Sequence, residues 1–235
     1  MSERAAERCP PEALRALGDA LPVGAGTAAM GVAFGVLVSH SGLAWWWATV
    51  FASVVLAGSL EFVLLGLVTA LAPLGQVAAA AFLVNVRHVF YALSFPLHRV
   101  PGVAAKAYST FALTDEAYAV TARPEARTWS RARILWLQGF VHVFWVGGVT
   151  SGALVGTLVP AAVAGLDFAV TALFVVLGID AFRAHRDVPT PLVALACAVG
   201  AHVVAGEQML VVAMVLFTAF LLARYALSRR AARRA

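Results

Sequence analysis

The segment LVNVRHVFYALSF, residues 83–95, is apolar for most of its length, yet Asn85, Arg87 and His88 fall within four positions of one another. Arginine keeps its proton in proteins, so inside a bilayer it requires a carboxylate or an anionic substrate as a partner. On a helix, Asn85 and His88 share one face, and Arg87 and Tyr91 share the neighbouring face. This polar stripe predicts the lining of a substrate or proton route, with a structural ion pair for Arg87 as the alternative.

A carboxyl group suited to this partnership is Glu61, which follows Ala57-Gly58-Ser59. The apolar run around it covers residues 44–71. As a straight helix this run would measure about 42 Å and overshoot a bilayer core of roughly 30 Å unless it tilts or breaks. A break at Gly58 and Ser59 would expose backbone groups that can bind a substrate, whereas a long tilted helix is the alternative. Glu61 could be neutral or ionised, depending on its distance from the arginine, and could carry a coupling proton.

The chain as a whole is too apolar for a soluble domain. Its 235 residues are 62% hydrophobic and only 12% charged, and the long continuous apolar runs favour membrane-spanning helices over a β-barrel. The net charge of +5 comes from arginines at the ends of these runs, which is typical of membrane proteins and points to no nucleic-acid partner. Two cysteines make neither a metal site nor a haem motif, so we expect no metal and no cofactor.

The predicted fold is an all-α, polytopic membrane helix bundle of about seven transmembrane helices. A polar N-terminal tail over residues 1–21, without the pattern of a signal peptide, precedes a single permease domain over residues 22–226. Residues 227–235 form a basic C-terminal tail, which the positive-inside rule assigns to the cytoplasm. The predicted membrane runs cover residues 22–39, 44–71, 74–97, 134–159, 165–182, 189–204 and 208–226.

The arginine-rich stretch over residues 98–133 leaves the topology open. In the favoured topology it is a cytoplasmic connection, seven helices cross the membrane, and the N-terminus lies outside. In the other topology, residues 107–122 form an eighth, polar crossing or a re-entrant segment, and the N-terminus lies inside. Asp115 and Glu116 would each cost about 2.5–3.5 kcal/mol at the centre of a lipid-exposed helix, so this segment would have to pack inside the bundle. Its acids could then contact a substrate ammonium or a proton, whereas a surface loop is the plainer interpretation.

Glycines recur at a spacing of four in two of the apolar runs. Gly31 and Gly35 lie in the first run, and Gly148 and Gly152 lie in the fourth. This spacing lets neighbouring helix backbones approach closely, so we expect packing surfaces. With seven crossings, the first and fourth helices would run in opposite directions, as in transporters built from inverted repeats.

Three sequence motifs together resemble the AzlC family, the larger subunit of bacterial branched-chain amino-acid exporters. They are AGSLEF at residues 57–62, NVRHVFY at 85–91 and LTDE at 113–116. The resemblance extends over roughly residues 20–165. It implies a plasma-membrane permease that works with AzlD, a small, separately encoded membrane protein, and exports leucine, isoleucine, valine or related amino acids. Glu61 departs from the family pattern, which usually has glutamine at this position.

These features predict a secondary-active amino-acid exporter of the bacterial cytoplasmic membrane. Coupling to the proton gradient is expected, because the sequence has no G-x-x-x-x-G-K-[ST] loop for binding a nucleotide. The predicted partners are the amino-acid substrate, membrane lipid and the AzlD-type protein. The sequence does not decide whether the chain also forms a homo-oligomer. The residues expected to bind substrate or couple protons are Gly58, Ser59, Glu61, Asn85, Arg87, His88, Tyr91, Asp115 and Glu116.

The sequence also contains features of two other classes of function. Ser59 with His88 or His142 could make an intramembrane serine hydrolase, but the flanking sequence lacks G-x-S-x-G, and we expect no enzyme. A non-transporting subunit that anchors a partner would suit the glycine-rich faces. The polar stripe around Arg87 argues against a purely structural subunit, since such residues are costly in lipid.

Overall fold

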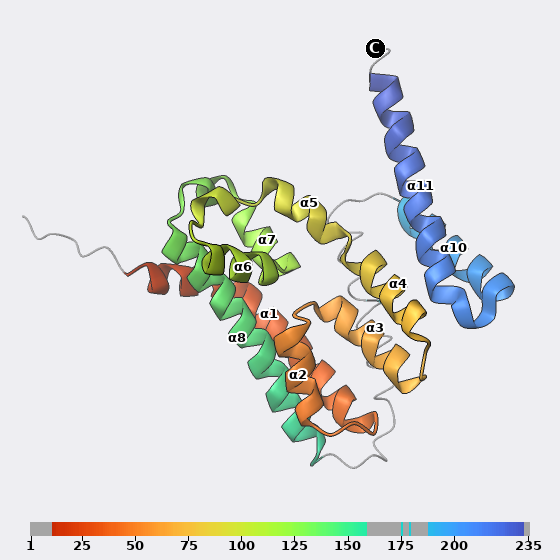
Figure 1. Ribbon diagram of the computed structural model, residues 1–235, viewed down its shortest axis with the longest axis horizontal. Helices are drawn as coiled ribbons and strands as arrows, with labels where there is room; N and C mark the ends of the chain where they lie inside the picture. Colours follow the sequence, from red (N-terminus) through yellow and green to blue (C-terminus); the bar gives the residue numbers. More distant parts are fainter. Residues whose placement is uncertain (1–10, 159–174, 176–178, 180–187, 233–235) are drawn as a thin grey trace, which may run out of the picture. The chain divides into compact units, whose positions relative to one another are not determined.

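The computed structural model describes residues 11–158, 175, 179 and 188–232, and every regular element in these ranges is helical (Figure 1). This confirms the predicted all-α fold. The chain divides into two compact units, Met1–Leu65 with Asn85–Ala162 and Gly66–Val84 with Val163–Ala235. The first unit holds every residue of the predicted site. The single permease domain over residues 22–226 stays a prediction.

In the first unit, two long helices pack beside shorter, interrupted ones. Helices α1 (Glu12–His40) and α8 (Arg131–Gly156) are long and apolar enough to cross a membrane. Because α1 begins at Glu12, part of the segment predicted as a polar tail is helical. The remaining elements are α2 (Trp46–Val54), α3 (Gly58–Thr69, with its last turn in the second unit), α5 (Arg87–Ser94), η1 (Leu97–Arg99), α6 (Val103–Phe111), α7 (Asp115–Thr121) and η2 (Pro124–Thr128).

The glycine faces of α1 and α8 pack directly against each other, as predicted. A Cβ atom on Gly35 would lie 2.0 Å from the carbonyl oxygen of Val149, and one on Gly152 would lie 2.1 Å from that of Val32. No side chain fits at such distances, so only glycine allows the two backbones to approach this closely. The Ser39 hydroxyl adds a hydrogen bond across this contact.

The two long helices run in the same direction. Near their first turns, Arg133 Nη2 lies 2.6 Å from Asp19 Oδ2, and near their last turns Ser39 Oγ donates to the Ala153 carbonyl at 2.7 Å. The expectation that the first and fourth helices run in opposite directions is therefore wrong. That expectation came from counting two membrane runs between these helices, whereas the structure has a further helical segment there, residues 103–121, which runs antiparallel to α8.

The interrupted helices run antiparallel to α8. The Thr49 hydroxyl of α2 lies 2.8 Å from that of Thr150, whereas α3, further along the chain, contacts the earlier residue Trp145 of α8. Helix α6 is also antiparallel to α8, because Tyr108 approaches His142 whereas the end of α6 approaches the earlier residue Gln138. Residues 107–122 thus pack along α8 as the end of α6 and the whole of α7, and they do not form a surface loop.

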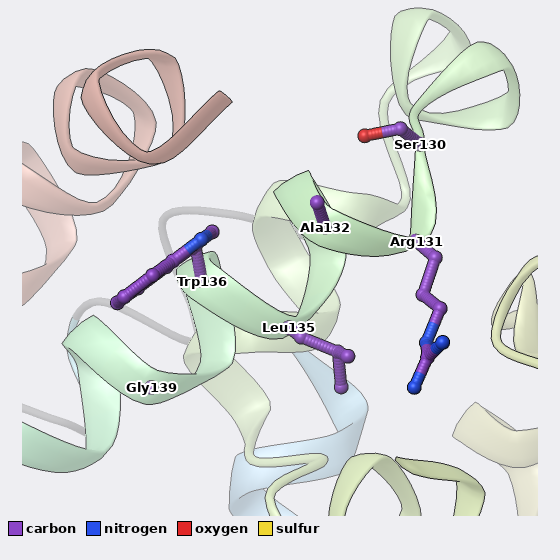
Figure 2. Close-up of a pocket in the computed structure, with 6 residues that line it drawn as sticks. All are labelled: Ser130, Arg131, Ala132, Leu135, Trp136 and Gly139. Carbon is purple, nitrogen blue, oxygen red and sulfur yellow. The ribbon is translucent and has the colours of Figure 1, made fainter. Parts of the chain in front are cut away.

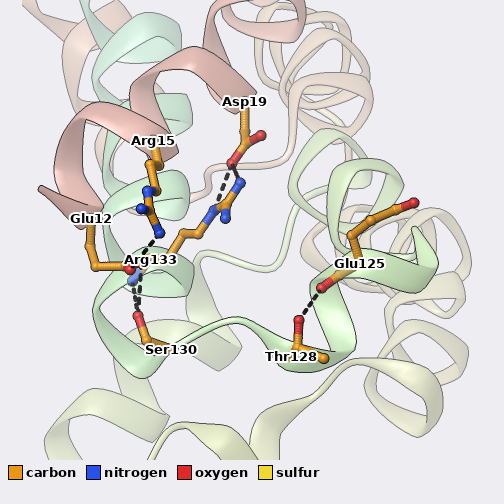
Figure 3. A network of polar contacts seen from close by, with 7 residues as sticks. All are labelled: Glu12, Arg15, Asp19, Glu125, Thr128, Ser130 and Arg133. Atoms are coloured by element: carbon orange, nitrogen blue, oxygen red, sulfur yellow. Dashed lines mark hydrogen bonds and ion pairs between the residues drawn. The ribbon is translucent and has the colours of Figure 1, made fainter. Parts of the chain in front are cut away.

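A polar network joins the first turns of α1 and α8 (Figure 3). The Ser130 hydroxyl donates to Glu12 Oε2 at 3.0 Å, and Arg15 Nη1 lies 3.6 Å from Glu12 Oε1. The guanidinium of Arg133 bonds Asp19 and lies 4.2 Å from the Trp129 ring centroid. Beneath this network lies an apolar core of Ala16, Ala20, Phe95, Val100, Leu113, Val120, Ala126, Trp129, Ile134, Leu137 and Val141.

The described part of the second unit includes α4 (Leu74–Asn85, which ends in the first unit), α10 (Pro189–Ala205), η3 (Gly206–Gln208) and α11 (Met209–Ala232). Arg224 Nη1 of α11 donates to the Thr190 hydroxyl of α10 at 2.8 Å, so α10 and α11 form an antiparallel hairpin. Gly206, with φ of +46°, turns the chain between them. The predicted run over residues 165–182 lies almost wholly outside the described residues.

Candidate functional site

The predicted break in the second apolar run is present. Helix α2 ends at Val54 and α3 begins at Gly58, and Leu56 between them has a φ of 47°. The break lies slightly before the predicted Ala57-Gly58-Ser59. A Cβ atom on Gly58 would lie 3.0 Å from the Trp145 ring, so the glycine lets this indole lie against the start of α3.

The buried side chain of Glu61 forms hydrogen bonds that hold this break in place. Its Oε1 accepts hydrogen bonds from the backbone N–H of Ala57 at 3.1 Å and from the indole N–H of Trp145 at 3.0 Å. The side chain is fully buried, and its Oε2 has no hydrogen-bond partner among the described residues. Phe34 packs edge-on against Phe62 at 4.9 Å and completes the apolar surroundings.

Arg87 forms an ion pair with Asp115, the first residue of α7. Its Nη2 lies 2.9 Å from Asp115 Oδ2 and also donates to the hydroxyl of Ser59. The predicted need of Arg87 for a carboxylate is thus met by Asp115, whereas Glu61, the acid that the sequence suggested for this role, is bonded to Trp145 instead. The Arg87 and Asp115 side chains are 38% and 40% exposed, so a small molecule can reach this pair.

The Arg87 guanidinium therefore joins the starts of two half-helices. Ser59 is the second residue of α3, and Asp115 is the first residue of α7. Helix α7 follows a second break, over residues 112–114, where the Thr114 side chain accepts from the N–H of Ala117 at 3.3 Å. Two segments far apart in sequence thus meet at one side chain.

Aromatic rings lie next to this ion pair on the faces of α5 and α7. Tyr91 stacks on Tyr118 with ring centroids 4.3 Å apart, and His88 meets Tyr91 edge-on at 5.4 Å. His88 Nδ1 lies 3.0 Å from the carbonyl oxygen of Asn85. The side chain of Glu116, by contrast, makes no hydrogen bond or ion pair with the described residues.

Several polar atoms of this cluster are buried without a hydrogen-bond partner in the described part of the chain. They include Asn85 Oδ1, Arg87 Nε and Asp115 Oδ1. Buried polar atoms normally have partners, so these atoms retain the capacity to bond a polar ligand if the side chains rearrange around it. A positive guanidinium, a carboxylate and two tyrosine rings can together hold a small zwitterion with an apolar side chain.

Two further residues belong to this arrangement but were missed from the sequence. Tyr118 forms the second aromatic ring, and Ser94 Oγ lies 2.9 Å from its hydroxyl. Gln138 of α8 is 1% exposed and donates to the carbonyl oxygens of Ser109 and Ala112. The only sequence signal for Gln138 is its place as a lone amide within the apolar run ILWLQGFVHVFW.

The serine hydrolase alternative finds no support in the geometry of the described residues. Ser59 bonds Arg87, whereas His88 bonds the Asn85 backbone and His142 Nδ1 lies 3.5 Å from the Tyr108 hydroxyl. A nucleophilic serine needs a histidine base within hydrogen-bond reach, and no such pair occurs in the described part of the chain.

An open depression of about 620 Å³ lies elsewhere, along the start of α8 (Figure 2). None of the predicted site residues lines it. In Figure 2 the Arg131 and Trp136 side chains project to different sides of the helix. The residues that line the depression are Ser130, Arg131, Ala132, Leu135, Trp136 and Gly139.

Comparison with known proteins gives consistent matches. The family model described as AzlC protein matches residues 22–159. The branched-chain amino acid transport protein AzlC of Bacillus subtilis is 29% identical over 83% of this chain and 78% of its own length. A membrane protein of Helicobacter pylori strain J99 is 30% identical over 86% of this chain and 92% of its own, and the inner membrane protein YgaZ of Escherichia coli is 26% identical over 72% and 73%. No solved structure gives a significant match.

Proposed function

Because the chain belongs to the AzlC family, a family of membrane transport proteins and not of enzymes, we propose that it exports branched-chain or related amino acids across the bacterial cytoplasmic membrane by secondary-active transport. The matched residues 22–159 include all nine predicted site residues.

The observation that carries the proposal is the contact of Arg87 with Ser59 and Asp115. An α-amino acid is a zwitterion, and its carboxylate and ammonium groups complement Arg87 and Asp115, respectively. The substrate would enter between these two side chains and replace their mutual contact. The stacked rings of Tyr91 and Tyr118 would then pack against the apolar side chain of the substrate.

Proton coupling is assigned to Glu61 in this proposal. When Glu61 is protonated on Oε2, its Oε1 can keep both accepted hydrogen bonds, so the carboxyl can gain or lose a proton without first breaking the helix contact. Ser59, two residues earlier on α3, bonds Arg87. A change at Glu61 could therefore reach the substrate site through the first turn of α3.

The parallel direction of α1 and α8 supports a cytoplasmic N-terminus. Two neighbouring helices that cross the membrane in the same direction must be separated by an odd number of crossings. The two apolar runs between them, 44–71 and 74–97, give an even number, and residues 103–121, which run antiparallel to α8, supply the third. With the arginine-rich connection before α8 and the basic C-terminus inside, the N-terminus would also lie inside.

A small AzlD-type membrane protein is proposed as the partner, on the basis of the family. The alternative of a non-transporting anchor subunit depended mainly on the glycine-rich faces. Gly35 and Gly152 are occupied within the chain by the contact between α1 and α8, so these faces are not free to anchor a partner. The accessible pair of Arg87 and Asp115 favours transport by this chain.

Efflux of preloaded, radiolabelled valine, leucine, isoleucine and methionine tests the proposal. Cells would express the chain with or without its neighbouring small membrane protein. Export that requires both proteins supports a two-component exporter, whereas export by this chain alone would remove the partner from the proposal. No efflux of any of the four, with both proteins present in the membrane, would contradict the proposed function.

A further inference from the structure

Two polar side chains of α8 form hydrogen bonds at the two helix breaks, one at the break before α3 and one at the break before α7. Trp145 bonds Glu61, which in turn bonds the N–H of Ala57 at the first break. Gln138 bonds the carbonyls at the second break. Residues 138 and 145 are seven positions apart, two helical turns, and so lie on the same face of α8.

At the second break, the Gln138 amide donates to two backbone carbonyl oxygens. Gln138 Nε2 donates to the carbonyl oxygen of Ser109 at 2.8 Å and to that of Ala112 at 3.2 Å. These carbonyls stand at the C-terminal end of α6, where a helix leaves its last carbonyls without intrahelical partners. Gln138 is 1% exposed, so water has little access to take its place as the donor.

The end of α6 in turn sets the start of α7. Only Leu113 and Thr114 separate Ala112 from Asp115, and the Thr114 side chain caps α7 by accepting from the Ala117 N–H. A shift of the α6 carbonyls therefore moves the Asp115 carboxylate, which must stay within reach of Arg87.

We propose that Gln138 is a positioning residue for substrate binding: its amide fixes the end of α6 and thereby holds Asp115 in place opposite Arg87. Helix α8 is then a fixed reference for both breaks, through Trp145 at the first and Gln138 at the second. The part of this inference that concerns substrate affinity rests on the proposed function.

Replacing Gln138 with methionine, Gln138→Met, keeps the approximate size of the side chain and removes the donor. We expect the KM for the exported amino acid to rise roughly ten-fold, with kcat little changed. The reason is that the variant loses the two hydrogen bonds to the Ser109 and Ala112 carbonyls, which in this proposal hold Asp115 in position. We also expect faster backbone amide hydrogen exchange over residues 112–118 and unchanged exchange in the middle of α1. Exchange needs no substrate, so this readout tests the positioning role even if the chain transports none of the tested amino acids.

The matched control is Thr150→Val, which removes another hydrogen bond of α8, the one to Thr49, but away from both breaks. It should leave KM and the exchange over residues 112–118 unchanged. Unchanged exchange over residues 112–118 in Gln138→Met would overturn the inference. Faster exchange spread equally over α1 and α8 would also overturn it, because that result would mean a general packing role.

Gln138→Glu supplies a readout that packing alone would not change. An ionised glutamate repels the two carbonyls, whereas a protonated one can donate to one of them. Transport by Gln138→Glu relative to the wild type should therefore rise as the pH falls and decline as the pH rises, and the same ratio for Gln138→Met should stay flat. An equal pH profile for the two variants would contradict the positioning role.

Discussion

The two helix breaks of the first unit differ in how far their acids can reach solvent. At the first break, Glu61 is fully buried and bonds Trp145 and the backbone of Ala57. At the second, Asp115 is 40% exposed and bonds Arg87. Both acids lie in the first turn of the half-helix that follows the break. Similar positions in the chain thus give one acid enclosed by protein and one open to a ligand.

This difference implies a division of roles. A ligand can displace an exposed partner of Arg87 more easily than a buried one, because the exposed ion pair contributes little stability of its own. The bonds of Glu61, in contrast, satisfy donors that would be costly to leave unpaired inside the protein. We therefore expect substitutions at the second break to change binding and those at the first to change folding or coupling.

The largest effect on transport is expected for Arg87→Gln. This variant removes the charge that joins Ser59 and Asp115 and, in the proposed site, binds the substrate carboxylate. A charge-assisted hydrogen bond contributes about 1.5–3 kcal/mol, so losing even one would reduce transport roughly 10- to 150-fold, and the loss of several should abolish it. Efflux is measured at equal amounts of protein in the membrane. Export at the wild-type rate would exclude Arg87 from the site.

Glu61→Leu should have the largest effect on stability. The variant leaves the Trp145 indole and the Ala57 N–H without their acceptor, and each unsatisfied buried donor costs about 1–3 kcal/mol. The melting temperature of the purified protein in detergent should fall clearly below that of the wild type. Glu61→Gln is the matched control, because its amide oxygen can accept both bonds, and it should melt close to the wild type. Equal melting of Glu61→Leu would mean that the carboxyl does not hold the break.

Glu61→Gln also tests coupling, with a more selective effect. Since glutamine keeps both accepted hydrogen bonds but cannot exchange a proton, exchange of labelled for unlabelled amino acid should continue, and export driven by a proton gradient should decline. Reconstituted vesicles with and without an imposed gradient separate the two activities. Gradient-driven export at full rate would assign coupling to another group.

Local chemistry was predictable from the sequence wherever it depended on residue type and spacing. The glycines at a spacing of four predicted a close helix contact, and the interruption near Gly58 predicted the first break, which is present between Val54 and Gly58. The requirement of Arg87 for a carboxylate was predictable as well, since an arginine in an apolar helix needs a partner.

Features that depend on the arrangement of distant segments were not predictable. The parallel direction of α1 and α8 leaves no trace in glycine spacing, and the choice of Asp115 over Glu61 as the partner of Arg87 depends on the packing of residues 107–122 along α8. Gln138 was missed because a single amide in an apolar run gains meaning only from the carbonyls it contacts. Tertiary contacts decided these points.

The smallest effect is expected for Arg131→Gln, at the open depression along the start of α8. Like Arg87, Arg131 is an arginine in the first unit, but its side chain has no ion pair with the described residues, and it lines no part of the predicted site. Transport and melting temperature should both stay close to wild type, since surface substitutions usually change stability by less than about 0.5 kcal/mol. The variant is therefore the matched control for Arg87→Gln, measured in the same efflux assay. A comparable loss of efflux in both variants would mean that net positive charge, and not the contact with Asp115, is what transport requires.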